Sequence, residues 1–406
     1  MSSAAAYLPG NWIRCQRWSL LVGIAGLVVL SLGGVADPQQ FFRAYLAAYL
    51  FYFGIGMGCM ALLMIYHITG GAWGFLIRRT LEAGMRTMPL LAIGFVPIVL
   101  GAPYLYPFAM PDMAANAQIL KQQAYMNLPF FSARAAVFFV LWLAWSYALT
   151  AASRRQDRTG DPRWAWRCDG LSGTGLLIYG VTIHFASIDW IMSLQPAFHS
   201  TIFGPMAASG HLLCGLAFAW IVLACLHGHP PLAEYVSPKA LNDLGSLLFA
   251  FVIIWTYMGW FQYMLIWIAN LPVDVIWYLP RIGGGWFWVA MALILLNFVV
   301  PFLLLLWRSV KQNPPLVARI AGLLLLMQMV FMQVLVQPAF AAQGIAEHWM
   351  DVVAPLGLGG IWLAYFVSRL RGWPLLPLHD FNQAGAVHLR RSGEEEAEWE
   401  EMLAHE

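Results

Sequence analysis

Ten apolar runs of about twenty residues each recur along this 406-residue chain. A helix of about twenty apolar residues crosses the hydrocarbon core of a bilayer, because each residue adds about 1.5 Å. A soluble globule is excluded, since 61% of the residues are hydrophobic and only 10% are charged. We predict an all-α integral membrane protein with ten transmembrane helices, near residues 18–35, 41–67, 87–106, 132–152, 171–193, 202–226, 242–270, 284–307, 316–336 and 350–370.

The basic residues predict the orientation of these helices, because loops kept in the cytoplasm are enriched in Lys and Arg. With the N-terminus inside, all but four of the 22 Lys and Arg residues fall in cytoplasmic loops or termini. The loop after the second span then carries Arg78, Arg79 and Arg86. We therefore expect both ends of the chain inside the cell, and the first run to be a retained span rather than a cleaved signal peptide. The four outliers are Arg43, Lys121, Arg134 and Arg281.

The apolar pattern divides the chain into two parts. Residues 1–371 are expected to form one polytopic membrane domain, and residues 372–406 a cytoplasmic tail with seven Glu between 394 and 406. The five cysteines show no C-x-x-C spacing, so we expect no iron-sulfur or structural zinc site within this chain, and any metal redox centre to belong to a partner or to be a haem. The net charge of +2 gives no case for a nucleic-acid partner.

One acidic residue and two histidines fall well within the apolar runs: Asp189 and His184 in the fifth, and His211 in the sixth. An ionisable group in hydrocarbon is costly, so each is a candidate functional residue. A constant rise per residue predicts one layer with His184, His211 and Tyr257, and a second, further outward, with Asp189, Gln262 and Tyr263. His184 and Asp189 are about 140° apart around their helix, so their partners are expected on other helices.

Four interpretations fit these layers. A proton path would use Asp189, His184, His211 and Tyr257, with Tyr179 and Thr174 on the inner half. A quinol pocket would use Asp189, Gln262 and Tyr263 to bind the head group. A haem b site would use His184 and His211 as axial ligands. Alternatively, the polar groups only bond neighbouring helices, and the chain is a scaffold.

Two motifs resemble a known family. One is His184-Phe-Ala-Ser-Ile-Asp-Trp-Ile-Met-Ser-Leu194, followed by Ser200-Thr-Ile-Phe-Gly204. The other is Gln262-Tyr-Met-Leu-Ile-Trp-Ile-Ala-Asn-Leu-Pro272, followed by Ile276-Trp-Tyr-Leu279. Both are similar to signatures of the ActF-type membrane subunit of bacterial alternative complex III, in the NrfD-like superfamily. The likeness extends from about residue 40 to about residue 370.

The resemblance implies two four-helix bundles, approximately 41–193 and 202–336, with the first and tenth helices peripheral. It implies a non-catalytic or co-catalytic subunit of a quinol:electron acceptor oxidoreductase in the bacterial cytoplasmic membrane, contributing to proton translocation. The implied partners are a second NrfD-like subunit, ActC, together with iron-sulfur and haem c subunits and membrane lipid. The resemblance also disfavours the haem b interpretation, because such subunits carry no prosthetic group of their own. A quinone or quinol remains the candidate ligand.

Overall fold

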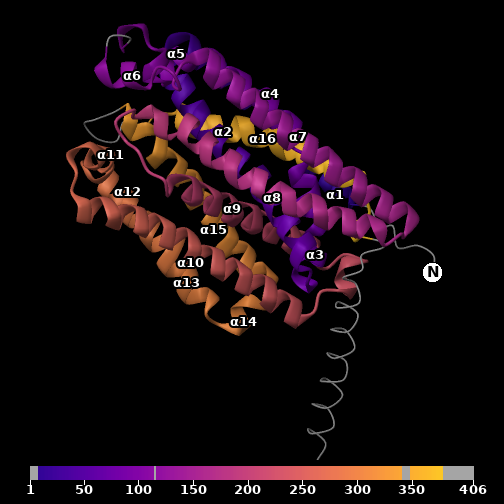
Figure 1. Ribbon diagram of the computed structural model, residues 1–406. Coiled ribbons are helices and arrows are strands. Elements are labelled where there is room, and N and C mark those ends of the chain that lie inside the picture. Colours follow the sequence, from indigo (N-terminus) through magenta and orange to yellow (C-terminus); the bar gives the residue numbers. More distant parts are fainter. Residues whose placement is uncertain (1–7, 114–115, 341–347, 378–406) are drawn as a thin grey trace, which may run out of the picture.

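The fold consists of helices and short connections, as the computed structural model shows for residues 8–113, 116–340 and 348–377 (Figure 1). These described residues contain no strand. Residues 378–406, which include most of the predicted acidic tail, lie outside them.

Nine helices in this part of the chain are long and apolar enough to cross a membrane. A tenth span results if α3 and α4, which meet at a 40° bend, are taken together. The predicted all-α class is therefore confirmed, and nine to ten helices of membrane length are compatible with the ten predicted spans. The spans are α1 (Gly10–Ala36), α2 (Pro38–Thr69), α3 (Ala72–Met85) with α4 (Met88–Leu100), α7 (Leu128–Thr159), α8 (Arg163–Trp190), α9 (Phe203–Leu226), α10 (Pro238–Ala269), α12 (Trp286–Leu293) with α13 (Val300–Leu305), α15 (Pro314–Val336) and α16 (Met350–Arg371).

Shorter helices connect the long ones: α5 (Ala102–Leu105), α6 (Ala117–Gln122), α11 (Pro272–Ile282) and α14 (Arg308–Lys311). The starts of four long helices are fixed by local sequence. Asp37, Asn127, Ser237 and Asn313 each accept a hydrogen bond from the backbone N–H three residues later, and proline follows at the first or second helical position. These caps satisfy N–H groups that a helix start leaves without partners.

The centre of the molecule is the contact between α2 and α9. Helix α2 is the most enclosed span and also packs against α3, α4, α8, α15 and α16. A Cβ atom added to Gly58 would lie 1.8 Å from the backbone oxygen of His211, and one added to Gly215 would lie 2.6 Å from the carbonyl carbon of Gly58. Only glycine permits the two backbones to touch in this way.

Helix α1 lies at the periphery and packs mainly against α16. Gly26 of α1 meets Gly357 of α16, where an added Cβ would lie 2.7 Å from the facing Cα. The rest of α1 is largely exposed and apolar, with Leu32 68% and Val35 85% exposed. A surface of this kind suits contact with lipid chains.

One predicted feature differs from the structure. Arg78 and Arg79 were expected in a loop, but they lie inside α3 and are almost fully buried. Helix α3 can bury them because Glu82, one turn later, pairs with both. Pro301 follows a π-helical turn at Ile294–Val299. Proline clashes with the carbonyl four residues before it, and widening that turn relieves the clash.

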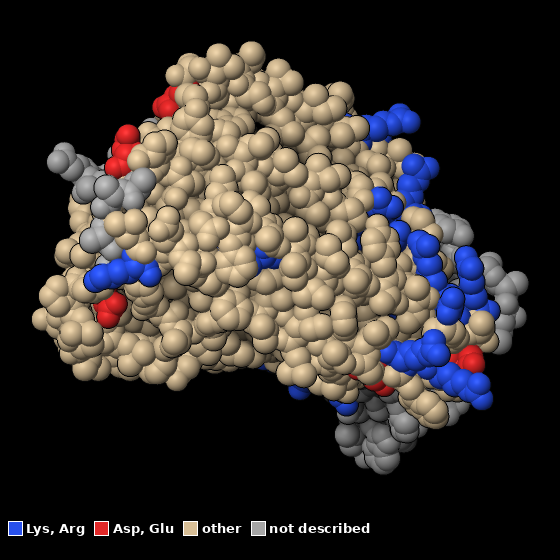
Figure 2. All heavy atoms as spheres, turned by 45° about the horizontal axis from the view of Figure 1, so that its top comes forward, with Lys and Arg blue, Asp and Glu red and all other residues tan. Residues whose placement is uncertain are grey.

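Most of the Lys and Arg side chains visible in Figure 2 lie at one end of the molecule. We call this the basic end; it holds the last turns of α7 and α16 and the first turns of α8, with Arg154, Arg155, Arg158, Arg163, Arg167, Arg369 and Arg371. The opposite end holds the starts of α2, α7 and α16. The long helices run between these two ends.

Candidate functional site

Helix α8 carries polar residues along one broad buried face. Ser172, Tyr179, Thr182 and Asp189 are all buried, and they recur at intervals of three and seven residues. Such intervals keep side chains on the same side of a helix. From Ser172 to Asp189 the helix rises about 25 Å, most of the thickness of a bilayer core.

Asp189, near the opposite end, forms an ion pair with Arg134 of α7. The guanidinium donates from Nε to Oδ2 at 2.7 Å and from Nη2 to Oδ1 at 2.9 Å. Arg134 also lies 3.8 Å from the ring centre of Tyr125 and 4.3 Å from that of Phe130. Burial, reinforced by the carboxylate, raises the pKa of the Tyr125 phenol to about 12. The partner of Asp189 is thus an arginine, and neither His184 nor His211 bonds it.

Tyr179 meets His211 of α9 in the middle of the molecule. The tyrosine hydroxyl lies 3.4 Å from Nδ1 of the imidazole, whose ring rests edge-on against Phe53 at 5.7 Å. His211 also lines a cavity of ≈20 Å³ with Gly210 and otherwise apolar side chains. That volume is enough for one water molecule.

His184 does not lie in the same layer as His211. Its Nδ1 would be 2.3 Å from a Cβ atom on Gly204, in the first turn of α9. His211 lies about two turns, or about 10 Å, further along α9. The predicted layer is therefore wrong for this pair. The two imidazoles do not face each other across a shared space, as the axial ligands of a haem must.

Other predicted residues lie apart from the buried face of α8. Tyr257 is 56% exposed, and Thr174 is exposed and bonds the carbonyl of Gly170 in its own helix. Gln262 is buried and accepts a hydrogen bond from Ser200, while Tyr263 packs edge-on against Tyr278. Asp189 and Gln262 thus have separate partners, and the structure does not join them into one head-group pocket.

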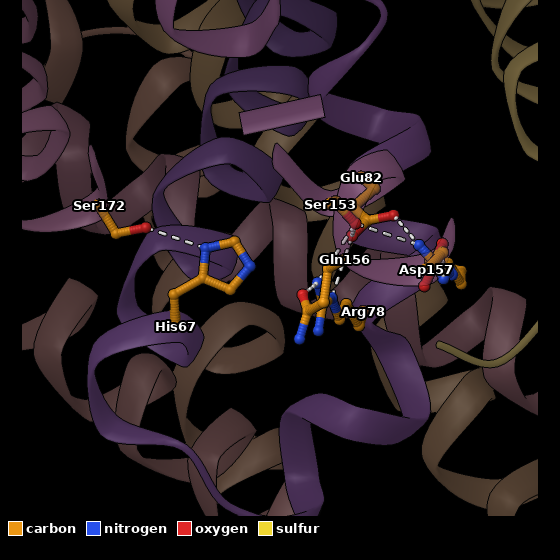
Figure 3. A network of polar contacts seen from close by, with 8 residues as sticks. His67, Arg78, Glu82, Ser153, Gln156, Asp157 and Ser172 are labelled. Atoms are coloured by element: carbon orange, nitrogen blue, oxygen red, sulfur yellow. Dashed lines mark hydrogen bonds and ion pairs between the residues drawn. The ribbon is translucent and has the colours of Figure 1, made fainter. Parts of the chain in front are cut away.

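A buried charged cluster that the sequence did not predict lies toward the basic end (Figure 3). Glu82 lies 3.0 Å from Arg78 and 2.6 Å from Arg79, which in turn lies 2.5 Å from Asp157. Ser153 donates to Glu82 at 2.7 Å. The cluster joins α3 to α7 and balances two cations with two carboxylates. A buried charge persists only with such partners.

A cavity of ≈450 Å³ lies beside this cluster and reaches the surface. Arg78, Gln156 and His67 line its inner part, while the exposed residues Trp166 and Asp169 line its mouth. His67 lies 2.9 Å, Nδ1 to Oγ, from Ser172, the first residue of the buried polar face of α8 (Figure 3). The cavity thus connects the basic end to that face.

Arg281 forms a second unpredicted polar centre, at the opposite end. It is buried and donates to the carbonyls of Val334 and Leu335, to that of Trp277, and to the side-chain oxygen of Gln195. Burial lowers the pKa of this guanidinium to about 9, so it is still protonated at neutral pH. Arg281 therefore clamps α11 to the end of α15 and to the segment after α8.

Comparison with known proteins identifies no relative: no protein-family model and no curated protein matches this chain. The resemblance to the ActF-type subunits therefore rests on the two motifs alone. The motif around Asp189 contributes the ion pair with Arg134, and the motif that begins at Gln262 contributes the contact with Ser200.

Proposed function

We propose that this chain is a proton-conducting membrane subunit of a bacterial quinol:electron acceptor oxidoreductase of the alternative complex III type. The observation that carries the proposal is the buried polar face of α8, which extends over about 25 Å and begins beside a cavity at the basic end. Polar groups inside membrane helices are expensive and mark ion or proton pathways. The basic end would be cytoplasmic, since retained loops are rich in arginine.

The proposed path begins in the cavity beside Arg78 and Gln156. It passes through His67 and Ser172 to Tyr179 and His211, and continues along Thr182 toward Asp189. Hydroxyl and imidazole groups can each donate and accept a hydrogen bond, as proton transfer requires. Ser172 and Tyr179 are about 10 Å apart along the helix, so water must bridge them.

Asp189 has a different role in this scheme from the freely titrating carboxylate that the sequence indicated. Its two oxygens accept hydrogen bonds from Arg134, whose positive charge favours the charged form of the carboxylate. The ion pair would close the path at the opposite end. A proton reaching Asp189 would weaken the pair, and its release would restore it.

The redox chemistry belongs to partner subunits in this proposal. This chain would contribute two four-helix bundles, α2–α4 with α7 and α8, and α9 and α10 with α12–α13 and α15, to an assembly with ActC and with iron-sulfur and haem c subunits. The contacts of α2 with α8 and of α9 with α10 and α15 support that grouping. Quinol oxidation elsewhere in the assembly would drive proton movement here.

Tyr179→Phe tests the path, because it removes one hydroxyl and leaves the ring in place. In the assembly purified from native membranes and placed in vesicles, we expect proton movement per quinol oxidised to fall at least about tenfold. Thr174→Ala is the matched control, since Thr174 is an exposed residue of the same helix whose hydroxyl bonds only its own backbone. Its proton movement should equal that of the wild type.

The proposal fails if Tyr179→Phe moves protons at the wild-type rate while His211→Gln does so too. A different result would indicate a scaffold. In that case both variants form less of the complete assembly, but the assembly that does form oxidises quinol and moves protons normally. Subunit content is therefore measured together with proton movement.

A further inference from the structure

Two arginines from separate elements lie over one indole ring at the basic end, and the backbone of a third arginine contacts one of them. Arg86, at the α3–α4 bend, lies 4.9 Å from the ring centre of Trp373, and Arg154 of α7 lies 4.7 Å from it. Arg369 of α16 joins them, because its carbonyl accepts a hydrogen bond from Arg86. We call Arg86, Arg154 and Arg369, with Trp373, the arginine cluster.

The arginine cluster carries more positive charge than its surroundings neutralise. The nearby carboxylates, Glu82 and Asp157, are engaged by Arg78 and Arg79. Within the described ranges, Arg86, Arg154 and Arg369 form no ion pair with any carboxylate. The indole ring offsets part of the repulsion through cation–π contact, but it supplies no counter-charge. Among the residues that the structure describes, most of the guanidinium N–H groups of these three arginines have no hydrogen-bond acceptor.

The position of the cluster indicates what kind of anion it meets. The ring of Tyr365 lies 4.3 Å from Arg369. Tyr365 and Trp373 are aromatic residues of the kind found where a membrane meets water. Helix α4 begins two residues after Arg86 and presents an exposed apolar face with Ile93 70% and Leu100 72% exposed. A phosphate group at the arginines would thus have an apolar surface beside it for its acyl chains.

We propose that the arginine cluster binds the phosphate groups of an anionic phospholipid from the adjoining leaflet. One guanidinium group can donate two parallel hydrogen bonds to one phosphate group. Basic pockets between helices on the cytoplasmic side are known to bind lipids such as cardiolipin. The bound lipid joins α7 to α16 through the α3–α4 bend and supplies the counter-charge that the cluster lacks. This inference is independent of the proposed proton path.

The test is lipid binding to the purified full-length chain in detergent, measured by native mass spectrometry and by the thermal unfolding midpoint. Cardiolipin, a lipid with two phosphates, is compared with phosphatidylcholine and with inorganic phosphate at equal phosphate concentration. We expect cardiolipin alone to remain bound, and to raise the midpoint by about 3 to 5 °C at a hundredfold excess over its Kd. Equal effects of phosphatidylcholine or of free phosphate would overturn the proposal.

Arg154→Gln is the first variant, because Arg154 is exposed and its replacement leaves the core intact. We expect it to weaken cardiolipin binding about fivefold, and Arg86→Gln/Arg154→Gln about 25-fold. Arg158→Gln, an exposed arginine one turn further along α7, is the matched control and should bind as the wild type does. Equal binding by Arg154→Gln and Arg158→Gln would overturn the proposal.

The acidic stretch 394–406 of the same chain is the competing occupant. A variant that ends after Pro377 separates the two. Cardiolipin binding that appears only after this truncation would assign the cluster to the tail and overturn the lipid proposal. Unchanged binding supports the lipid.

Discussion

Asp189→Ala should destabilise the protein by about 3 to 5 kcal/mol, the usual cost of removing one partner of a buried ion pair. The substitution leaves the Arg134 guanidinium between the rings of Tyr125 and Phe130 without its carboxylate. That cation is enclosed, with a side chain only 10% exposed. The measurement is the free energy of unfolding of the purified chain, by denaturant titration in mixed micelles.

The double variant Arg134→Met/Asp189→Leu provides the control for this prediction. It removes both charges and keeps similar side-chain volumes, so we expect it to recover most of the lost stability. A double variant as unstable as Asp189→Ala would show that the charges are not what stabilises this contact. The same variant should lose the proposed closure of the proton path even though it folds.

Glu82→Leu is expected to have an effect of similar size, about 3 to 5 kcal/mol, because two buried guanidinium groups share this carboxylate. Arg79 would keep Asp157, which lies 2.5 Å from it, but the two buried cations would then outnumber the remaining carboxylate. The variant should also loosen the contact of α3 with α7, which protease sensitivity at the basic end can detect.

The matched control for Glu82→Leu is Asp243→Leu, a change of the same charge at an exposed position in the first turns of α10. Exposed charges contribute little to stability, so its unfolding free energy should change by less than about 1 kcal/mol. Similar losses for the two variants would contradict the view that burial makes Glu82 important.

The apolar runs predicted the number and approximate limits of the long helices, because length and hydropathy are local properties. The α3–α4 bend was not predicted, because it depends on contacts with other helices and not on local hydropathy. Arg78 and Arg79 look like loop residues in a hydropathy pattern, and their burial depends on Asp157, Ser153 and Gln156, which are remote in the sequence. Partners of that kind become visible only when α3 and α7 pack together.

The sequence indicated that Asp189 needs a partner from another helix, and it held a signal that was not used. Arg134 is the one basic residue within the predicted span 132–152, and an unpaired cation in one span next to an unpaired carboxylate in the next suggests a pair. The heights of His184 and His211 were not predictable to within a turn. They depend on how residues 191–202 connect α8 to α9. The prediction used only a constant rise per residue from the centre of each span, and it took no account of that connection.

The glycine contact between α2 and α9 limits how this molecule can work. With backbone against backbone at Gly58 and Gly215, there is no side-chain layer along which one half could slide past the other. Alternating access by rocking moves one helical bundle against the other, and in the proposed grouping α2 and α9 belong to different bundles. We therefore expect a stationary conduit, in which only side chains, water and protons change position during turnover.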